Sequence, residues 1–411
     1  MRRLVASYCT RQFVRRLGNK ANRLIIDISY SPMKKKIKYF ICLFFIYLKR
    51  MRLYMFYRNQ FKRYCKMQGI GNKEAEGEKD YKKKWGVFGW PVEPYSYRLF
   101  SRYMGCRADI VPEDIGHSFV EDTLDAVRFS DFYQDKNVYD RLFVEGTTPV
   151  TVLRRMGGSV LMDKDYNKID MGGGINSLLS DSYDRLVLKP SIDTGSGIGV
   201  MLFEKKNNGK YISVKENQEL TLDFLMNYGD DFVLQEALRQ HSLLSKFNAT
   251  SVNTLRIAIY RSVKDEKVNV TGALVRIGRS GEICDNAHMG GYFVGINPEN
   301  GHLNHYACEQ YGNRSKKWND VDYEANDFVI PNWDKVIEFA KYIGSRLLHC
   351  RLIQLDIAID EQGKPRLIEY NINGFSFWLF MLSGQNPLGR FTDEIIAYCK
   401  ERKDKSVHFK V

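Results

Sequence analysis

The chain has 411 residues, of which 44% are hydrophobic, 27% charged and 13% aromatic. This composition excludes disordered, collagen-like and disulfide-scaffold proteins, and the length allows two or three domains with buried cores. The net charge of +13 is concentrated in residues 1–85, which carry 23 basic and 5 acidic side chains, whereas the remainder carries 39 basic and 44 acidic ones. A mildly acidic body argues against nucleic acid as a partner.

The basic excess belongs to an N-terminal leader, which we place at residues 1–67. Its uncharged run, Tyr39–Leu48, has ten residues, whereas a membrane-spanning helix needs about 20. Residues 51–67 mix aromatic and cationic side chains, which favours a helix lying on an anionic membrane surface. The alternative is a basic helix packed on the protein's own acidic body. Residues 68–85 are rich in Gly, Glu and Lys, and we expect a linker there.

The rest of the chain shows two successive patterns. Residues 86–150 are expected to be mainly helical, because apolar residues recur every three or four positions over 95–104 and 118–132. Beyond them, short apolar runs predict strands that alternate with helices. We expect strands at 186–188, 198–203, 232–234, 255–260, 268–277, 352–359 and 366–370, and helices at 220–228, 333–348 and 393–403. Helices over mixed, largely antiparallel sheets make the fold class α+β.

The predicted hairpin near the C-terminus carries the strongest candidate site. With its turn centred on Gln362-Gly363, Asp356 lies opposite Glu369, and Asn371 shares the face of Glu369 because strand side chains alternate. Two carboxylates brought together among apolar residues repel each other unless a cation neutralises them. Oxygen ligands without Cys or His suit Mg²⁺ or Mn²⁺. The alternative is an exposed polar hairpin face with ordinary surface carboxylates.

Two further elements are candidates for binding phosphate. Lys189 ends the strand at 186–188, and a Gly- and Ser-rich loop follows at 191–200, whose N–H groups can approach phosphate oxygens. The alternative for this loop is a simple turn. Arg256 and Arg276 lie one on each strand of the pair 255–260 and 268–277, where a guanidinium is costly to bury without an anionic partner. They would stabilise a phosphoryl group or, alternatively, pair with structural carboxylates.

In their order and spacing, these motifs resemble the ATP-grasp superfamily, in particular its sugar-transfer-associated, glutamate-ligase-related branch. The resemblance runs from about Asp131 to Lys400 and includes Asp135-Lys136 before Thr148-Pro149, Val233-Leu234-Gln235-Glu236-Ala237-Leu238, and the segment Asp285–Gly291. It implies an ATP-grasp fold in which residues 151–240 and 241–405 form two α+β subdomains that grip ATP between antiparallel sheets.

The same resemblance implies a role for each candidate residue. The expected ATP contacts are Lys136 and Lys189, the loop residues Ser191, Gly195, Ser196 and Gly197, the hinge residues Gln235, Glu236, Ala237 and Leu238, and His241 in place of a ribose-binding acid that the chain lacks. The expected catalytic residues are Arg256, Arg276, Asn286, Gly290 and Gly291, and the expected metal ligands are Asp356, Glu369 and Asn371.

The activity that the resemblance implies is an ATP- and Mg²⁺-dependent carboxylate–amine ligase that forms an amide through an acyl-phosphate. The family context implies that it joins an amino acid or another amine to a sugar acid in surface polysaccharide assembly. We expect a cytoplasmic protein, held at the membrane face by its leader. One alternative is a phosphotransferase that acts on a sugar derivative, and another is a non-catalytic, membrane-docked nucleotide-binding module.

Overall fold

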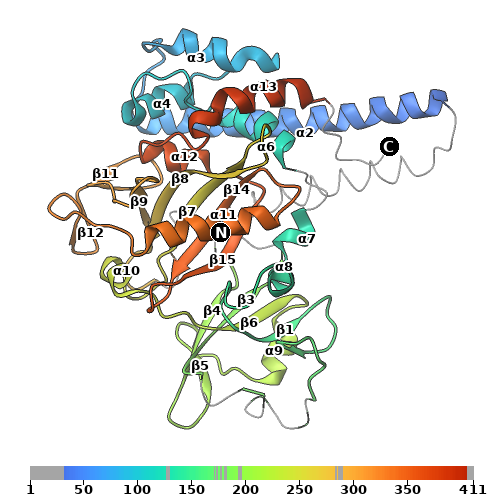
Figure 1. Ribbon diagram of the computed structural model, residues 1–411, viewed down its shortest axis with the longest axis vertical. Helices are drawn as coiled ribbons and strands as arrows, with labels where there is room; N and C mark the ends of the chain where they lie inside the picture. Colours follow the sequence, from blue (N-terminus) through green and yellow to red (C-terminus); the bar gives the residue numbers. More distant parts are fainter. Residues whose placement is uncertain are drawn as a thin grey trace. The chain divides into compact units, whose positions relative to one another are not determined.

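The computed structural model describes residues 32–125, 130–170, 172, 175, 178–179, 183–192, 197–282, 285 and 290–404. The chain divides into two compact units. Unit 1 comprises residues 1–128, 373–381 and 390–411, and unit 2 comprises residues 129–372 and 382–389 (Figure 1). The helical region expected at 86–150 is therefore shared between the units, because the chain enters unit 2 near residue 129.

Unit 1 is helical, and its longest element is α2 (Pro32–Met67). One side of α2 buries Cys42, Ile46, Tyr54, Phe61 and Cys65, and the helix packs on α4, α5 and the short helix η2. Burying a large apolar side chain stabilises a fold by about 1.5–3 kcal/mol, so this side holds α2 on its own unit. Within the described residues, no helix combines the length and the apolar composition that crossing a membrane requires. The other helical elements of unit 1 are α3 (Glu78–Trp85), η1 (Gly86–Phe88), α4 (Tyr95–Met104), α5 (Glu113–Ile115), η2 (Gly116–Val120), α6 (Glu121–Leu124), most of α12 (Phe377–Leu382) and α13 (Thr392–Arg402), with η8 (Gly389–Phe391) at the boundary.

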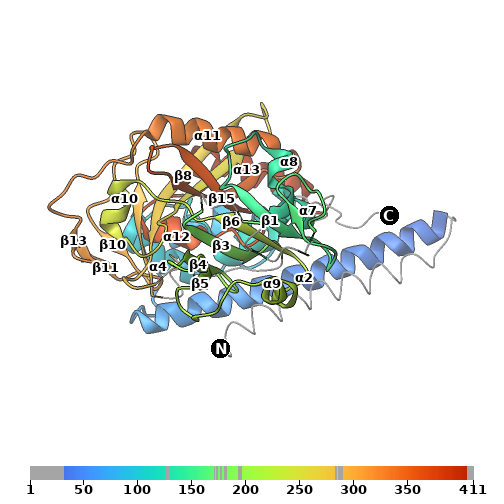
Figure 2. The same cartoon turned by 90° about the horizontal axis from the view of Figure 1, so that it is seen from below.

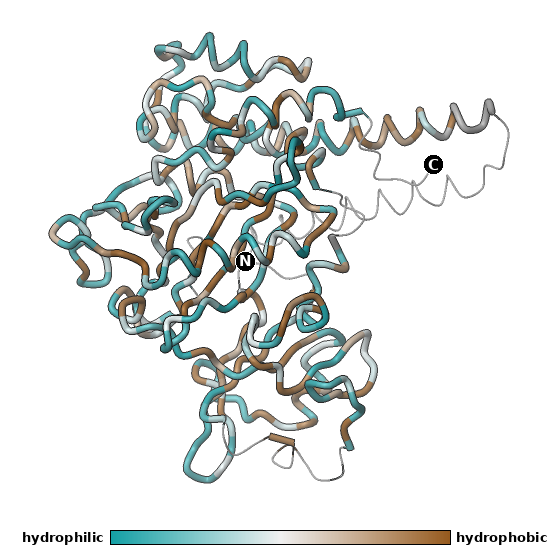
Figure 3. Tube along the Cα trace, in the orientation of Figure 1, coloured by the Kyte–Doolittle hydropathy of each residue, from teal (hydrophilic) through white to brown (hydrophobic). Residues whose placement is uncertain are grey.

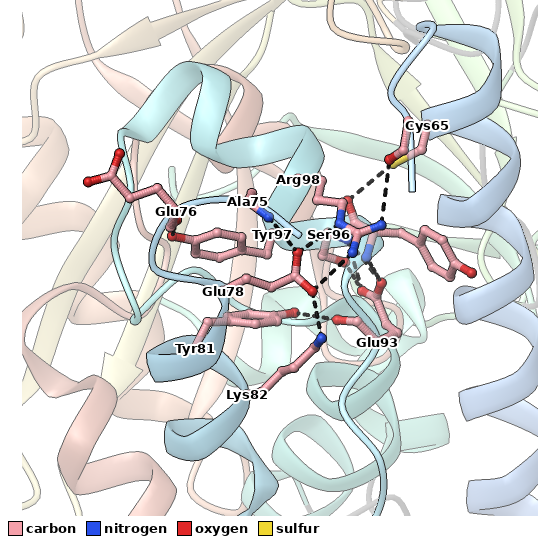
Figure 4. A network of polar contacts seen from close by, with 12 residues as sticks. Cys65, Ala75, Glu76, Glu78, Tyr81, Lys82, Glu93, Ser96, Tyr97 and Arg98 are labelled. Atoms are coloured by element: carbon pink, nitrogen blue, oxygen red, sulfur yellow. Dashed lines mark hydrogen bonds and ion pairs between the residues drawn. The ribbon is translucent and has the colours of Figure 1, made fainter. Parts of the chain in front are cut away.

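The segment expected to be a linker differs from that expectation, because its second half is α3. Tyr81 and Trp85 of this helix are fully buried, and so is Glu78. Figure 4 shows how the Glu78 carboxylate is held: it accepts hydrogen bonds from Arg98, at 2.7 Å, and from the Ala75 N–H, at 3.1 Å, and it pairs with Lys82 at 2.6 Å. Composition alone treats Glu and Lys as solvated, whereas here they form a buried ion-pair network that anchors the helix.

A second buried polar cluster in unit 1 centres on His117, on the single π-helical turn η2. Its Nδ1 lies 2.7 Å from Glu121 and its Nε2 3.1 Å from Glu113. Its ring stacks on Tyr57 with the centroids 3.8 Å apart. Burial disfavours the imidazolium, but the two carboxylates outweigh burial and raise the pKa of His117 to about 9. His117 is therefore charged in the folded protein at neutral pH.

We expect the stability of unit 1 to fall as the pH rises above neutrality. A raised His pKa contributes stability that is fully present below the unfolded value, near 6.5, and is lost as the pH passes about 9. The shift corresponds to about 3 kcal/mol. Burial raises the pKa of Glu93 from 4.5 to about 7, so its contribution has the same sign but is lost earlier, between those two pH values. Thermal unfolding between about pH 6 and pH 10 should show a falling Tm that His117→Gln flattens, and an equal slope in both proteins would contradict the assignment.

Unit 2 contains two antiparallel sheets. The six-stranded sheet has the order β2 (Met162–Asp163), β1 (Thr151–Arg155), β6 (Phe232–Glu236), β3 (Arg185–Pro190), β4 (Met201–Lys205) and β5 (Tyr211–Ser213). The seven-stranded sheet has the order β11 (Arg314–Ser315), β10 (Ala307–Cys308), β9 (Tyr292–Ile296), β8 (Val268–Ile277), β7 (Leu255–Arg261), β14 (Leu352–Ile359) and β15 (Pro365–Asn371). A small pair, β12 (Lys317–Trp318) and β13 (Val321–Asp322), completes the strands of the described residues. The α+β class is thus confirmed.

Helices of unit 2 cover only part of these sheets. α9 (Leu222–Tyr228) contributes Leu225 to the core of the six-stranded sheet. α11 (Trp333–Arg346) packs on β7 and β8 and lies along one face of the seven-stranded sheet (Figures 1 and 2). The remaining helical elements of unit 2 are α7 (Ser130–Gln134), η4 (Lys136–Val138), α8 (Tyr139–Leu142) and α10 (Ser242–Phe247).

Alternation along the strands of the seven-stranded sheet places the candidate site residues on the face opposite α11. Leu255 and Ile257 of β7 join Val336 and Ala340 of α11 in one hydrophobic cluster. Because successive strand side chains point to opposite faces, Arg256, which lies between the two β7 core residues, points to the face away from α11. The face opposite α11 therefore carries Arg256, Arg276, Gln354 and Asp356 among buried apolar residues such as Ala258 and Leu274.

Candidate active site

The predicted metal-binding hairpin consists of β14 and β15. Asp356 and Glu369 are Cα partners, as the sequence predicts, and Asn371 lies opposite Gln354. Beyond Asp356 the register shifts by one residue, so that Ile357 faces Leu367. A bulge of this kind re-aims side chains: Leu367 joins the core while Glu369, two residues on, faces the polar side.

Arg256 and Arg276 converge on the hairpin carboxylate. Arg256 donates to Asp356 through Nε, at 2.8 Å, and through Nη2, at 2.7 Å, and Arg276 Nη1 donates to the same side chain at 3.0 Å. Burial favours the neutral acid, but the two guanidinium groups outweigh burial and hold the pKa of Asp356 below its usual range. Among the described residues, Arg256 and Arg276 thus pair with carboxylates, which was the alternative to a phosphoryl group.

Asp285 extends this chain of charges, although its motif predicted no individual role for it. Its Oδ1 accepts from Arg276 Nη2 at 2.7 Å, and its Oδ2 accepts from the Thr254 N–H at 3.0 Å. Asp285 therefore fixes the second arm of Arg276 and ties the start of the segment 285–291 to the beginning of β7. The signal that would have found it is an arginine in an apolar strand that needs an anion, together with two carboxylates, Glu282 and Asp285, between β8 and β9.

Two lysines approach the hairpin from the six-stranded side. Lys136 of η4 lies 3.4 Å from Glu369. Lys189, on β3, is itself partly buried, and its burial and the nearby charge of Lys136 lower its pKa to about 7. Both predicted phosphate-binding lysines are therefore close to the predicted metal ligands. A pair of cations that repel each other in a desolvated place is an arrangement that an anionic ligand would stabilise.

Ser191 and Asn137 fix the position of Lys136. The Ser191 carbonyl accepts from the Lys136 N–H at 3.1 Å. The Asn137 side chain donates to Ser191 Oγ at 3.0 Å and to the Arg155 carbonyl at 3.1 Å. Ser191, expected as a direct ATP contact, thus has a structural role that joins η4 to the end of β3.

The predicted adenine hinge lies at the end of β6. The Gln235 amide donates to Thr151 Oγ1 at 3.1 Å, so this side chain is held within the sheet. The Ala237 N–H donates to the Arg185 carbonyl at 3.0 Å and is not a free donor for a base. Glu236 is exposed and Leu238 half-buried. Of the four hinge residues, Glu236 and the Leu238 backbone are therefore the better placed for a nucleotide.

His241, expected to replace a ribose-binding acid, caps α10. The His241 ring Nδ1 accepts from the Leu243 N–H at 3.2 Å, and the His241 backbone N–H donates to the Ile359 carbonyl at 2.9 Å. An N-cap of this kind satisfies a helix donor that otherwise lacks a partner. These contacts hold the chain between the two sheets, next to β14.

Some predicted site residues lie outside the described part of the chain. These are Gly195 and Ser196 of the phosphate loop and Asn286 of the catalytic segment. Of their neighbours, Gly197 has φ 71° and Gly290 φ 86°, conformations that favour glycine. Gly291 is buried directly before β9. Strand β4 begins at Met201 rather than near 198, because the Gly197–Val200 turn precedes it.

Unsatisfied polar atoms remain on the hairpin face. Both polar atoms of the buried Gln354 side chain, and the Asn371 Nδ2, have no hydrogen-bond partner among the described residues. Alternation places Gln354 on the face of Asp356, which makes it a site residue that the sequence offered but that received no role. Orphaned polar atoms in a buried place point to a missing ligand, ion or water.

The donor set fits a divalent cation. No group of three or more His, Cys, Asp or Glu side chains in the described ranges is placed to hold a metal ion, so the amide of Asn371 would have to supply the third ligand. A carboxylate offers about four acceptor positions, and three on Asp356 are occupied by the arginines. The remaining lone pairs of Asp356 face the half-buried Glu369, and Asn371 has an unpartnered Nδ2. The side-chain oxygens of these three residues are of the ligand type that Mg²⁺ accepts.

Comparison with known families identifies the class of protein. Residues 131–395 match the family described as "Sugar-transfer associated ATP-grasp". The match covers more than half of the chain. The chain therefore belongs to this family and has the ATP-grasp fold, as its sequence motifs indicated. No curated protein sequence matches the chain.

Three synthetases and ligases are among the solved structures to which the chain is similar. The D-alanyl-alanine synthetase A of Vibrio cholerae is 11% identical, with 67% of this chain and 65% of that chain covered and a TM-score of 0.34. The D-alanine–D-alanine ligase of Coxiella burnetii is 11% identical, with 68% and 60% covered and a TM-score of 0.36. The L-amino acid ligase of Bacillus licheniformis is 10% identical, with 66% and 49% covered and a TM-score of 0.32. This chain spans less than two thirds of the length of each.

Proposed function

We propose that the protein is an ATP- and Mg²⁺-dependent carboxylate–amine ligase. The observation that carries the proposal is the charge arrangement around the hairpin, where Lys136 and Lys189 approach the Asp356–Glu369 pair and Lys189 has a pKa of about 7. Four cationic side chains face three carboxylates in this region, counting Arg256, Arg276 and Asp285. A local excess of positive charge beside oxygen donors suits a nucleotide polyphosphate with its divalent metal.

The proposed roles follow from the positions of the side chains. Lys136 and Lys189 would neutralise the polyphosphate, and the hinge, with Glu236 and Leu238, would hold the adenine. Mg²⁺ on Asp356, Glu369 and Asn371 would supply charge neutralisation of the phosphate oxygens. The Gly- and Ser-rich loop at 191–200 would cover the phosphates, with His241 near the ribose. Asn286, Gly290 and Gly291 would lie beside the acyl group.

The proposed reaction has two steps. A substrate carboxylate oxygen attacks the γ-phosphorus of ATP, the bond to the β-phosphate oxygen breaks, and ADP leaves. The nitrogen of an amine then attacks the acyl carbon, the bond from that carbon to the phosphate oxygen breaks, and phosphate leaves as the amine loses a proton. The protein contributes position and electrostatic stabilisation, and no covalent bond to an enzyme side chain is required.

The substrate class is proposed from the family. Its association with sugar transfer supports a sugar acid as the carboxylate and an amino acid or another amine as the partner, in surface polysaccharide assembly. Such assembly takes place at a membrane, so we also propose a cytoplasmic enzyme that works at the inner membrane face.

Product analysis tests this proposal. The purified full-length chain is incubated with ATP, Mg²⁺ and pairs drawn from a panel of uronic acids and amino acids, while ADP and inorganic phosphate are followed separately. A ligase releases equal amounts of both, and only when carboxylate and amine are both present. Release of ADP without phosphate would instead identify a phosphotransferase, and no release with any pair would favour a nucleotide-binding module.

ATP binding should take up a proton at Lys189. Burial and Lys136 lower the pKa of Lys189 to about 7 in the free protein, and bound phosphates favour the charged amine. Below about pH 7 the amine is already charged, whereas above it ATP affinity should fall by up to about tenfold per pH unit. Calorimetry near pH 8, in buffers of different ionisation enthalpy, should show uptake of about one proton by the wild type and none by Lys189→Arg, because arginine stays protonated. Equal uptake by both proteins would contradict the assignment.

A further inference from the structure

The helix α2 has a second apolar face besides the one that packs on unit 1. Ile37, Phe40, Phe44 and Tyr47 recur every three or four residues, so they share one side of the helix. All four are exposed, Phe40 to 67% and Phe44 to 58%. Figure 3 shows brown, hydrophobic bands along this part of α2, which extends beyond the other helices of unit 1 (Figures 1 and 2). An exposed apolar stripe of this kind is typical of an interaction surface.

The same side of α2 becomes basic toward its C-terminal end. The spacing of three or four residues continues from Tyr47 through Met51 and Met55 to Arg58, and from there to Lys62 and Lys66. Lys62 and Lys66 are exposed. Across its 36 residues, α2 carries 11 Lys and Arg and no Asp or Glu. We call the series Ile37, Phe40, Phe44, Tyr47, Met51, Met55, Lys62 and Lys66 the α2 stripe.

The α2 stripe differs from the membrane segment that the sequence favoured. Within residues 51–67, the aromatic residues Tyr54 and Phe61 are buried in unit 1. Besides Met55 and Phe56, the exposed apolar side chains of α2 lie earlier, between Ile37 and Tyr47, where Tyr47 also packs edge-on against Trp90. Packing on the protein's own body and docking elsewhere are therefore both available to α2, through different sides of one helix.

We propose that the α2 stripe docks on an anionic lipid surface, with the helix parallel to the membrane plane. A helix of 36 residues is about 54 Å long, and Lys34, Lys35, Lys36 and Lys38 at its start, like Lys62 and Lys66 near its end, favour both ends staying in the water. Phe40 and Phe44 then reach the acyl chains, while Lys62 and Lys66 meet anionic head groups. This inference deepens the proposed membrane setting and uses none of the ligase chemistry.

Vesicle binding by the full-length chain tests the α2 stripe. The wild type should bind phosphatidylcholine vesicles that contain phosphatidylglycerol and should bind pure phosphatidylcholine far less. Phe40→Ser with Phe44→Ser should weaken binding to the anionic vesicles by about tenfold for each phenylalanine. Lys62→Glu with Lys66→Glu should weaken it further and reduce its dependence on salt.

The matched control is Phe132→Ser, because Phe132 is a similarly exposed phenylalanine, at 56%, outside α2. It should bind vesicles as the wild type does. Equal vesicle affinity of the wild type and the Phe40, Phe44 double variant would overturn the proposal. The proposal would also be overturned if the wild type did not bind vesicles but formed a dimer, or bound single-stranded DNA, through the same two phenylalanines. ATP turnover on soluble substrates should be the same in all these variants, which separates a failure of docking from a failure of the ligase assignment.

Discussion

Replacing Glu369 with Gln should abolish ATP turnover while the protein stays folded. Glu369 faces Asp356 across the hairpin and lies 3.4 Å from Lys136, so it connects the candidate metal site to a candidate phosphate-binding lysine. The amide keeps the size of the side chain but removes the charge that would hold a divalent cation. Loss of such electrostatic stabilisation costs on the order of 10²–10³-fold in kcat. Because Glu369 is partly exposed, the Tm should change little.

The matched control for this variant is Glu361→Gln, which makes the same chemical change on the turn of the same hairpin. Glu361 is exposed, and its carboxylate accepts a hydrogen bond from the side chain of its neighbour Gln362 at 2.9 Å. Its variant should turn over ATP as the wild type does. Wild-type turnover by Glu369→Gln would remove the metal assignment, and a large loss in Glu361→Gln would show that the hairpin is merely sensitive to substitution.

Replacing Arg276 with Met should destabilise unit 2 and also remove activity. Arg276 is buried and joins Asp285 at 2.7 Å to Asp356 at 3.0 Å. Without it, the contacts with Thr254 are those that Asp285 keeps among the described residues, so its carboxylate must lie in the interior as an unpaired charge or become protonated. Removing one partner of a buried ion pair costs about 3–5 kcal/mol. Denaturant unfolding should show this loss, and it should be larger at pH 8 than at pH 5, where Asp285 protonates more readily.

Two companion variants separate charge from geometry. Arg276→Lys retains the charge but cannot reach both carboxylates with one planar group, so it should recover part of the stability and little of the activity. Arg279→Met removes an exposed arginine three residues further along. It should change the free energy of unfolding by no more than about 0.5 kcal/mol and leave the activity unchanged. If Arg276→Met and Arg279→Met unfolded at the same midpoint denaturant concentration, the buried chain of charges would not contribute to stability.

The sequence predicted the hairpin register well on one side only. A turn at Gln362-Gly363 and alternation along the strands placed Asp356 opposite Glu369, as observed. Strict alternation wrongly predicts that Leu367 shares the face of Glu369, because alternation alone does not predict the bulge between them. The bulge follows from tertiary packing: Leu367 is drawn into the core against α11 while Glu369 remains with the charged groups.

The sequence was less informative wherever charged residues are buried. Glu78 and Lys82 lie in the segment that was predicted to be a linker, although their ion pairs with each other and with Arg98 stabilise α3. For Arg256 and Arg276 the sequence left a phosphoryl group and a structural carboxylate as alternative partners, and Asp356 pairs with both. In each case a partner distant in the sequence determines where the charged side chain lies. Spacing along the chain does not reveal which charged residue that partner is.

Electron paramagnetic resonance of Mn²⁺ tests the central claim most directly, because free and protein-bound Mn²⁺ differ in their spectra. The full-length protein is titrated with Mn²⁺ in the presence and absence of a non-hydrolysable ATP analogue. The account predicts tight binding that depends on the nucleotide and that Asp356→Asn and Glu369→Gln each weaken by about tenfold or more, while Glu361→Gln leaves it unchanged. Nucleotide-dependent Mn²⁺ binding of equal strength in all four proteins would contradict the assignment of the hairpin as the metal site.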